Sequence, residues 1–243
     1  MGNVIWIVGI GPGAREFMTG QAVAAIEASD VVVGYSKYVE LIRNAFPGKE
    51  FRSTGMTREI ERCALCFDLA AEGKRVALVC SGDAGVYGMA SPMLELSAGY
   101  PDVELAVAPG VTAANSGAAL LGAPLGHDYC VVSLSDLLTP WPVIEKRLTA
   151  AIEADFALAI YNPASHNRPD YLAKACGVML RAGAREDRAC GYVENIGRAG
   201  ETAAVCTLGE LKSRQVNMFT TVFIGNSQSY LLGNKIVTKR GYL

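Results

Sequence analysis

The chain alternates short apolar runs rich in β-branched residues with longer stretches whose apolar residues recur at helical spacing. Strand followed by helix, repeated many times, is typical of an α/β protein with parallel or mixed sheets. A helix of small residues is expected at 112–121, and the pattern restarts after it. We therefore expect two α/β domains, residues 1–112 and 113–243. The expected strands are residues 4–10, 31–34, 76–82, 103–109, 129–135, 155–162, 190–195 and 220–226.

The composition indicates a soluble, well-packed protein. Hydrophobic residues make up 51% of the 243 residues and charged residues 19%, with a mean hydropathy of +0.23. The formal charge is 22 − 24 = −2, which gives no electrostatic signature of nucleic-acid binding. The uncharged run 105–126 is interrupted by Pro109-Gly110 and by polar residues, so we expect no membrane span. No secretion signal is evident at the N-terminus, and a cytoplasmic location is expected.

The seven cysteines are odd in number and scattered among apolar residues, which favours reduced, buried thiols. Cys63 and Cys66 form a CxxC pair in a helical stretch. No second pair follows, and the only histidines are His127 and His166. We expect the pair to be structural and expect no metal site.

Glycine-rich loops follow the expected strands. Residues 9–13, GIGPG, resemble the start of a dinucleotide-binding fingerprint. Ala14 stands in the place of the third glycine, Pro12 lacks an N–H, and Asp30 precedes its strand instead of following it. These departures disfavour a nicotinamide or flavin site. A plain strand-to-helix turn also explains the loop.

Further loops, at 81–88 and 109–113, follow the strands at 76–82 and 103–109. Taken singly, each is explained by local structure, because Asp83 suits a turn and Thr112 suits a helix cap. Taken together, they lie at carboxyl ends of strands, where open α/β sheets bind ligands.

Several longer strings together carry a family resemblance. They are GIGPG with Met18-Thr19, SGDAGVYG, PGVTAANSGAALLGAPL, SLSDLLTPW, YNPAS with Arg168, and TTVFIGNS. Over residues 3–230 the chain resembles the tetrapyrrole methylases, the class III methyltransferases. Within that family, GYSKYVELI, STGMTREIERC and SLSDLLTPW are most similar to members that methylate precorrin-3B at ring carbon 17 in vitamin B12 synthesis.

The resemblance implies a fold of two αβα domains with an active-site trough between them, and a homodimer. It also implies S-adenosyl-L-methionine as methyl donor and a small tetrapyrrole as substrate. Gly82 is expected to be a position where only a hydrogen fits beside the donor. By the same resemblance, the donor site comprises Pro12, Gly82, Asp83, Val86, Tyr87, Thr112, Ala113, Asn162, Val193, Thr220 and Thr221.

The implied product is precorrin-4, formed by methylation at carbon 17 and contraction of the ring. Methyl transfer from a sulfonium needs alignment and no metal, whereas contraction needs a base. The candidate bases are Asp83, His127, Asp136 and Glu194. His127 is equally explained as a loop residue, and Asp136 as the cap of a helix beginning near Leu137.

Basic residues in or near the loops suit a polycarboxylate substrate, foremost Arg15, Lys37 and Arg168. Three alternatives to the precorrin-3B function stay open. The first is the same methylation of cobalt-factor III, which the lack of an added domain or metal-ligand string slightly disfavours. The others are a dinucleotide-dependent oxidoreductase and a tetrapyrrole carrier without catalysis.

Overall fold

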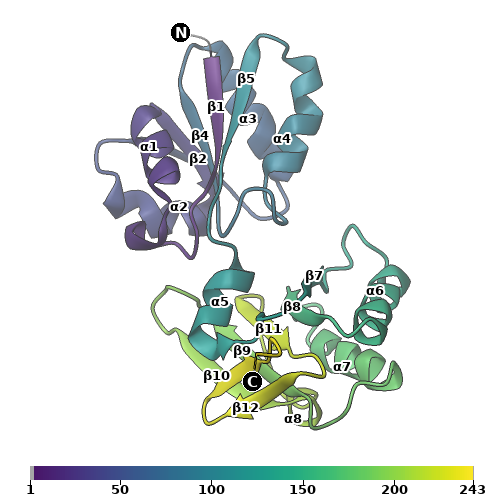
Figure 1. The fold of residues 1–243 in the computed structure, drawn as a ribbon. Coiled ribbons are helices and arrows are strands. Elements are labelled where there is room, and N and C mark those ends of the chain that lie inside the picture. Colours follow the sequence, from purple (N-terminus) through teal and green to yellow (C-terminus); the bar gives the residue numbers. More distant parts are fainter. Residues whose placement is uncertain (1–2, 243) are drawn as a thin grey trace. The chain divides into compact units, whose positions relative to one another are not determined.

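The computed structural model describes residues 3–242, which form two compact units. The first unit ends at Ala113 and the second begins at Ala114. The division expected from the sequence falls one residue earlier. Each unit is built around its own five-stranded sheet (Figure 1).

In the first unit the strand order is β3-β2-β4-β1-β5 and every pair is parallel. All five carboxyl ends therefore lie at one edge of the sheet. The strands are β1 (Asn3–Gly9), β2 (Val31–Tyr35), β3 (Glu50–Thr54), β4 (Val76–Cys80) and β5 (Val103–Ala108). The helices are α1 (Gly20–Ala28), α2 (Ser36–Ile42), α3 (Glu59–Ala71) and α4 (Ala90–Leu96), with 3₁₀ turns at Arg15–Phe17, Arg43–Ala45 and Ser97–Gly99.

Helices cover both faces of this sheet. Ile5 and Ile7 of β1 pack in the core formed with α3 and α4, whereas Val8 packs in the core formed with α1 and α2. Because both faces are covered, consecutive residues of a central strand are all buried, as in β4. Continuous apolar runs in the sequence correspond to these central strands.

The second unit contains a mixed sheet of order β10-β9-β11-β8-β7. Strands β7 and β8 are parallel, and β11 is antiparallel to both β8 and β9. The strands are β7 (Tyr129–Ser133), β8 (Ala157–Tyr161), β9 (Ala189–Glu194), β10 (Thr202–Thr207) and β11 (Thr220–Ile224). The helices are α5 (Ala113–Leu121), α6 (Trp141–Glu153), α7 (Tyr171–Arg181) and α8 (Leu208–Leu211).

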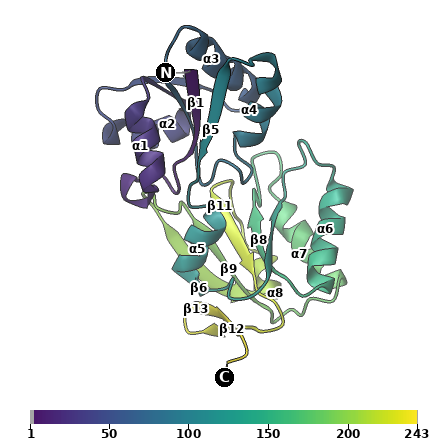
Figure 2. The same cartoon turned by 45° about the horizontal axis from the view of Figure 1, so that its top comes forward.

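Helix α5 covers one face of the mixed sheet, and α6 and α7 cover the other (Figure 2). The alternation along β8 fits this arrangement, since Ala159 packs beside α5 while Leu158 and Ile160 pack towards α6 and α7. A small third sheet joins β6 (Gly122–Ala123) to the hairpin of β12 (Ser229–Leu232) and β13 (Lys235–Thr238).

The α/β prediction is confirmed, but the sequence analysis missed several peripheral strands. Strands β3 and β10 lie at sheet edges and carry exposed residues, so their hydrophobic pattern is weak. All seven cysteines are free, and burial raises the pKa of Cys63 to about 11 and that of Cys176 to about 12. Among residues 3–242, no helix is long and apolar enough to cross a membrane.

Gly9 and Gly110 allow the ends of strands β1 and β5 to contact each other and the loop that follows β4. A Cβ atom on Gly110 would lie 2.1 Å from the carbonyl oxygen of Gly82, and one on Gly9 would lie 2.7 Å from the nitrogen of Gly110. These neighbours are backbone atoms, which cannot rotate away. Close approach of three backbone segments therefore requires glycine here.

We predict that Gly110→Ala lowers the free energy of unfolding by about 2–3 kcal/mol, as expected for forced overpacking. Gly20→Ala is the matched control, because nothing lies within 4 Å of its added Cβ and the residue begins α1. It should leave stability unchanged or raise it by about 0.5 kcal/mol. Denaturant unfolding measures both variants, and equal stabilities for the two would contradict the crowding argument.

Candidate active site

In the first unit, the loops after β1 and β4 are joined by backbone hydrogen bonds. Gly11 N–H donates to the Gly82 carbonyl at 3.0 Å, and Gly82 N–H donates to the Gly11 carbonyl at 2.8 Å. Both glycines have left-handed backbones, with φ of +63° and +70°. Buried Pro12 sits in the same turn. The two loops therefore form one continuous surface at the carboxyl edge.

Asp83 joins the second of these loops to the loop after β5. Its Oδ1 accepts a hydrogen bond from Gly85 N–H at 2.8 Å, and its Oδ2 accepts one from Gly110 N–H at 2.9 Å. Both carboxylate oxygens thus hold backbone amides. This arrangement favours a positioning role for Asp83 over the role of a base.

The segment 83–90 is a tight loop that places Tyr87 at the surface. Ala90 N–H donates to the Ala84 carbonyl at 3.0 Å, and a Cβ on Gly88 would lie 2.4 Å from the same oxygen. Tyr87 is 58% exposed and has φ of +53°, a conformation that costs free energy in a non-glycine residue. Residues with strained backbone conformations are often found at ligand-binding and active sites.

At Gly82 the protein's own atoms leave room for a side chain, and the expected crowding beside the donor stays a prediction. A Cβ there would lie 3.7 Å from the Thr112 Cα and 3.8 Å from the Ala113 nitrogen, which is ordinary contact. Within the protein itself, the left-handed φ is what demands glycine. The same distances place Thr112 and Ala113 beside Gly82, and half-buried Val86 belongs to the same edge.

In the second unit, the pairing register of the strands brings several residues that are expected to bind the methyl donor to one edge of the sheet. Val222 of β11 pairs with Ile160 and Thr220 pairs with Glu194, so the start of β11 lies beside the carboxyl ends of β8 and β9. Asn162 follows β8 directly, with φ of +52°, and its Nδ2 donates to Ser133 Oγ at 3.0 Å.

The residues of β9 and β11 that are expected to bind the methyl donor are buried. Val193 is fully buried in the core beneath α5, so its side chain supports the edge and does not line it. Thr220 and Thr221 are also buried. Glu194 accepts a hydrogen bond from Asn217 Nδ2 at 2.6 Å. The neighbouring Asn195, with φ of +54°, was missed by the sequence analysis.

Asp136 lies in a polar cluster after β7. Tyr171 Oη donates to Asp136 Oδ2 at 2.5 Å, and Arg168 Nε lies 3.7 Å from Oδ1. Arg168 also donates to the Leu134 carbonyl at 2.9 Å. The Tyr171 hydrogen bond, followed by the nearby positive charges, lowers the pKa of Asp136. Asp136 is therefore held ionised.

The expected helix near Leu137 is wrong, because α6 begins at Trp141 and residues 136–140 form a loop. Asp136 therefore caps no helix at that position. Leu137 and Leu138 in this loop are 74% and 93% exposed. Tyr171 was missed by the sequence analysis because it is 35 residues from Asp136 and nothing local marks the pair.

His127 lies at the other edge of the second sheet. It precedes β7, whereas Asp136 follows it, and a five-residue strand spans about 17 Å. Half-exposed His127 accepts a hydrogen bond from Asp128 N–H at its Nδ1. The structure does not bring His127 to Asp136, and it favours the loop interpretation.

Two expected substrate residues of the first unit are engaged with their neighbours. Arg15 pairs with Glu27 at 2.5 Å and donates to the Ala45 carbonyl at 3.1 Å. Lys37 is exposed and lies 3.7 Å from Glu40. Lys37 is thus the freer of the two cations.

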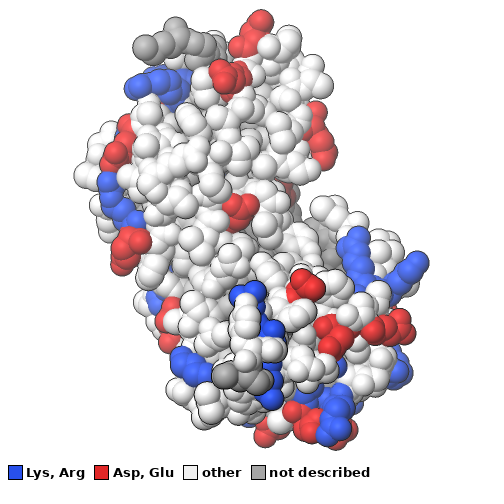
Figure 3. Space-filling model, in the orientation of Figure 1, with Lys and Arg blue, Asp and Glu red and all other residues white. Residues whose placement is uncertain are grey.

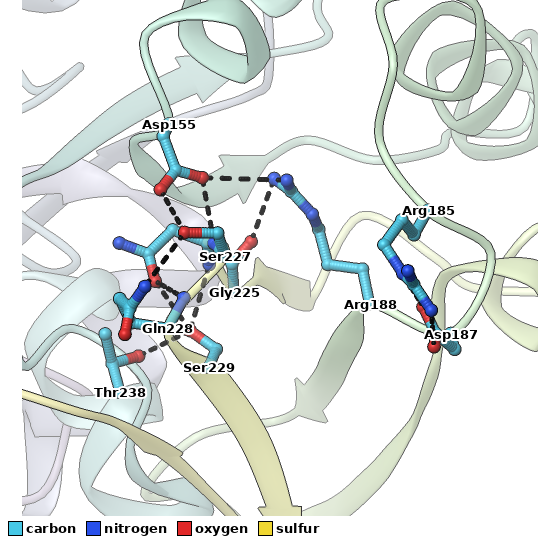
Figure 4. Close-up of polar contacts among 10 residues, drawn as sticks. Asp155, Arg185, Asp187, Arg188, Gly225, Ser227, Gln228, Ser229 and Thr238 are labelled. Carbon is cyan, nitrogen blue, oxygen red and sulfur yellow. Dashed lines mark hydrogen bonds and ion pairs between the residues drawn. The ribbon is translucent and has the colours of Figure 1, made fainter.

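The amino edges of both sheets are occupied by structural ion pairs. Asp30 precedes β2 and binds Arg75 at 2.6 Å, far from any ribose position of a dinucleotide site. In the second unit, Asp155 accepts from Ser227 N–H and Oγ at 2.8 and 2.6 Å, with Arg188 at 3.6 Å (Figure 4). These groups pair with one another, which leaves the carboxyl edges as the ligand-binding candidates.

Charge is dispersed over the surface in view, where positive and negative side chains are interspersed (Figure 3). Among residues 3–242, no three His, Cys, Asp or Glu side chains are grouped so that they could hold a metal ion.

We predict that Tyr171→Phe raises the pKa of Asp136 towards its ordinary value, because the hydrogen bond to the carboxylate is lost. A lowered pKa stabilises the fold above the unfolded value, about 3.9, and the gain is lost as the pH falls through the lower folded value. The stability difference between wild type and variant should therefore shrink in acid. Carboxyl NMR titration measures the pKa, and an unchanged Asp136 titration would contradict the assignment.

Comparison with known proteins agrees with this geometry. The family model described as tetrapyrrole (corrin/porphyrin) methylases matches residues 4–212. A probable cobalt-factor III C(17)-methyltransferase of Salmonella typhimurium is 48% identical over 238 residues, covering 97% of this chain and 98% of the relative. A precorrin-3B C(17)-methyltransferase of a Sinorhizobium species is 37% identical over 236 residues, covering 96% and 92%.

The fold is also found among solved structures. The crystal structure of the methyltransferase CobJ superposes with a TM-score of 0.88 and 33% identity, covering 97% of this chain and 99% of the other. At 97% coverage the match extends through both units. The chain belongs to the tetrapyrrole methylase family.

Proposed function

We propose that the protein transfers a methyl group from S-adenosyl-L-methionine to ring carbon 17 of a precorrin-3B-type macrocycle in vitamin B12 synthesis. One observation carries the proposal beyond family membership. Three glycine loops at adjacent strand ends are fixed to one another through the Gly11–Gly82 pair and through Asp83. In open α/β sheets ligands bind at the carboxyl ends of the strands, and this edge offers them a backbone surface there.

In this proposal the loops of the first unit hold the methionine portion of the donor, chiefly through residues 82–87 and 112–113. In the second unit, the residues that the family resemblance assigns to the donor are Asn162, Thr220 and Thr221, at the carboxyl edge of its sheet. Buried Val193 supports that edge from beneath. The positive φ of Tyr87 and Asn162 supports the assignment, because the strained residues stand in the loops that the ligand would contact.

The donor supplies an already activated methyl group. The chain's own task in that step is to hold the acceptor carbon in line with the methyl group and to exclude water. The short loop-to-loop hydrogen bonds serve this task, since they restrict the motion of the donor surface. Methyl transfer as proposed needs no metal.

Ring contraction needs a base, and Asp136 is the candidate that we propose. It is partly exposed, and Tyr171 holds one of its oxygens. Asp83 is committed to backbone amides, and His127 lies at the opposite edge of its sheet. Arg168, beside Asp136 in the second unit, would bind a substrate carboxylate. Lys37 is the corresponding candidate of the first unit, considered by itself.

Two substrates fit the proposal. They are metal-free precorrin-3B and cobalt-factor III. The relative named for cobalt-factor III is 48% identical, against 37% for the relative named for precorrin-3B. The methylation assay should therefore include both substrates. The homodimer and the cytoplasmic location stay predictions.

We predict that S-adenosylhomocysteine stabilises the protein and that NADH does not. At 100 times its dissociation constant the ligand adds about 2.7 kcal/mol to the free energy of unfolding. A thermal-shift titration measures both ligands. If NADH stabilised the protein and S-adenosylhomocysteine did not, the proposed methyltransferase function would be rejected in favour of the oxidoreductase.

We predict that Asp136→Asn slows ring contraction by about 10²–10⁴-fold, the usual cost of losing a general base, while methyl transfer continues. A methylated, uncontracted macrocycle should then accumulate in assays with precorrin-3B or cobalt-factor III, and mass and absorption spectra would detect it. Asp187→Asn, at the amino edge of the same sheet and paired with Arg185, is the control and should behave as wild type.

Either of two results would remove Asp136 from the role of base. Product formed at the wild-type rate would show that contraction does not need its carboxylate. Loss of both steps together would show that Asp136 positions the substrate instead.

A further inference from the structure

Arg62 on α3 is a buried cation. Only 4% of the residue is exposed, although arginine is rarely this buried without an anionic partner. Its Nε donates to Thr54 Oγ1 at 2.9 Å and its Nη2 to the Gly55 carbonyl at 2.8 Å. Its Nη1 lies 3.8 Å from Met89 Sδ. The guanidinium thus links the end of β3 to the residue that precedes α4.

All of these partners are neutral, as is the ring of Tyr35, whose centroid lies 6.0 Å from the Arg62 Cζ. Within residues 3–242, no carboxylate oxygen lies within 4.0 Å of Arg62, whereas nearby Arg52 pairs with Glu50 and Arg58 pairs with Glu61. Arg62 also stands in the first turns of α3, where the helix dipole disfavours a cation. Burial of a charge under these conditions costs stability. The side chain is therefore poorly explained as a stabilising element.

Its contacts suggest a positional role instead. Met89 ends the donor loop, which we define as residues 81–89. Asp83 fixes the beginning of this loop through Gly110, and the Ala90–Ala84 hydrogen bond closes its turn. Arg62 contacts Met89, at the other end of the donor loop. A loop held at both ends presents Val86 and Tyr87 in one arrangement.

We propose that Arg62 is a positioning residue that fixes the far end of the donor loop for binding of the methyl donor. The consequence for binding rests on the proposed function. The anchoring of the loop is a property of the protein alone and is testable without ligand.

The test uses Arg62→Met, which keeps the length and the apolar stem, and Arg62→Lys, which keeps the charge and part of the hydrogen bonding. The matched control is Arg75→Met, which removes an exposed arginine at the opposite edge of the same sheet. Four quantities are measured for each variant: amide exchange of the donor loop (residues 81–89), the melting temperature, the affinity for S-adenosylhomocysteine and the steady-state constants.

Arg62→Met should keep the melting temperature within about 4 °C of wild type, because the cost of the buried charge disappears with its hydrogen bonds. Amide exchange should speed up in the donor loop and stay unchanged in β4. The affinity for S-adenosylhomocysteine should fall about tenfold, or about 1.4 kcal/mol. The KM for the donor should rise while the KM for the tetrapyrrole does not, and Arg62→Lys should recover part of the loss.

Unchanged exchange in the donor loop of Arg62→Met would overturn the proposal, as would wild-type affinity for S-adenosylhomocysteine. An equal loss in the Arg75→Met control would overturn it too, since the effect would then be a general one. If Arg62→Met does not fold, the same measurements on Arg62→Lys decide. If the wild type does not bind S-adenosylhomocysteine, the proposed identity of the methyl donor is wrong. The exchange data would still decide whether Arg62 anchors the loop.

Discussion

The Asp83 carboxylate, bound to the amides of Gly85 and Gly110, is the interaction on which the arrangement of the first unit's edge depends. It works together with the paired amides of Gly11 and Gly82, so that three loops from β4, β1 and β5 become one rigid surface. Glycine at positions 9 and 110 is needed because the backbones approach too closely for a side chain. Hydrogen bonding, crowding and backbone conformation therefore act on the same few residues.

Strand direction decides which candidate residues can share a site. In each sheet, residues that follow parallel strands gather at one edge and residues that precede them gather at the other. Asp136, Asn162 and the start of β11 meet at the carboxyl edge of the second unit. His127, Asp30 and Asp155 stand at amino edges, where Asp30 and Asp155 form ion pairs. The candidate site residues Asp136 and Asn162 thus lie in loops that the second sheet aligns at one edge.

Much of this arrangement could be predicted from the sequence. The buried central strands are continuous apolar runs and the loops are glycine-rich strings, so the α/β class and the edge of the first unit followed from local pattern. Tyr171, Ser133 and Arg62 could not be found that way, because their partners are 35, 29 and 7 to 27 residues away. The buried state of Val193 and the distance from His127 to Asp136 likewise depend on register and strand direction, which no local pattern contains.

A crystal structure of the complex with S-adenosylhomocysteine tests the central claim most directly. The account predicts ligand density against residues 82–87 and 112–113 of the first unit, with the Asp83–Gly110 hydrogen bond intact. Ligand bound at an amino edge, beside Asp30 or Asp155, would contradict the account.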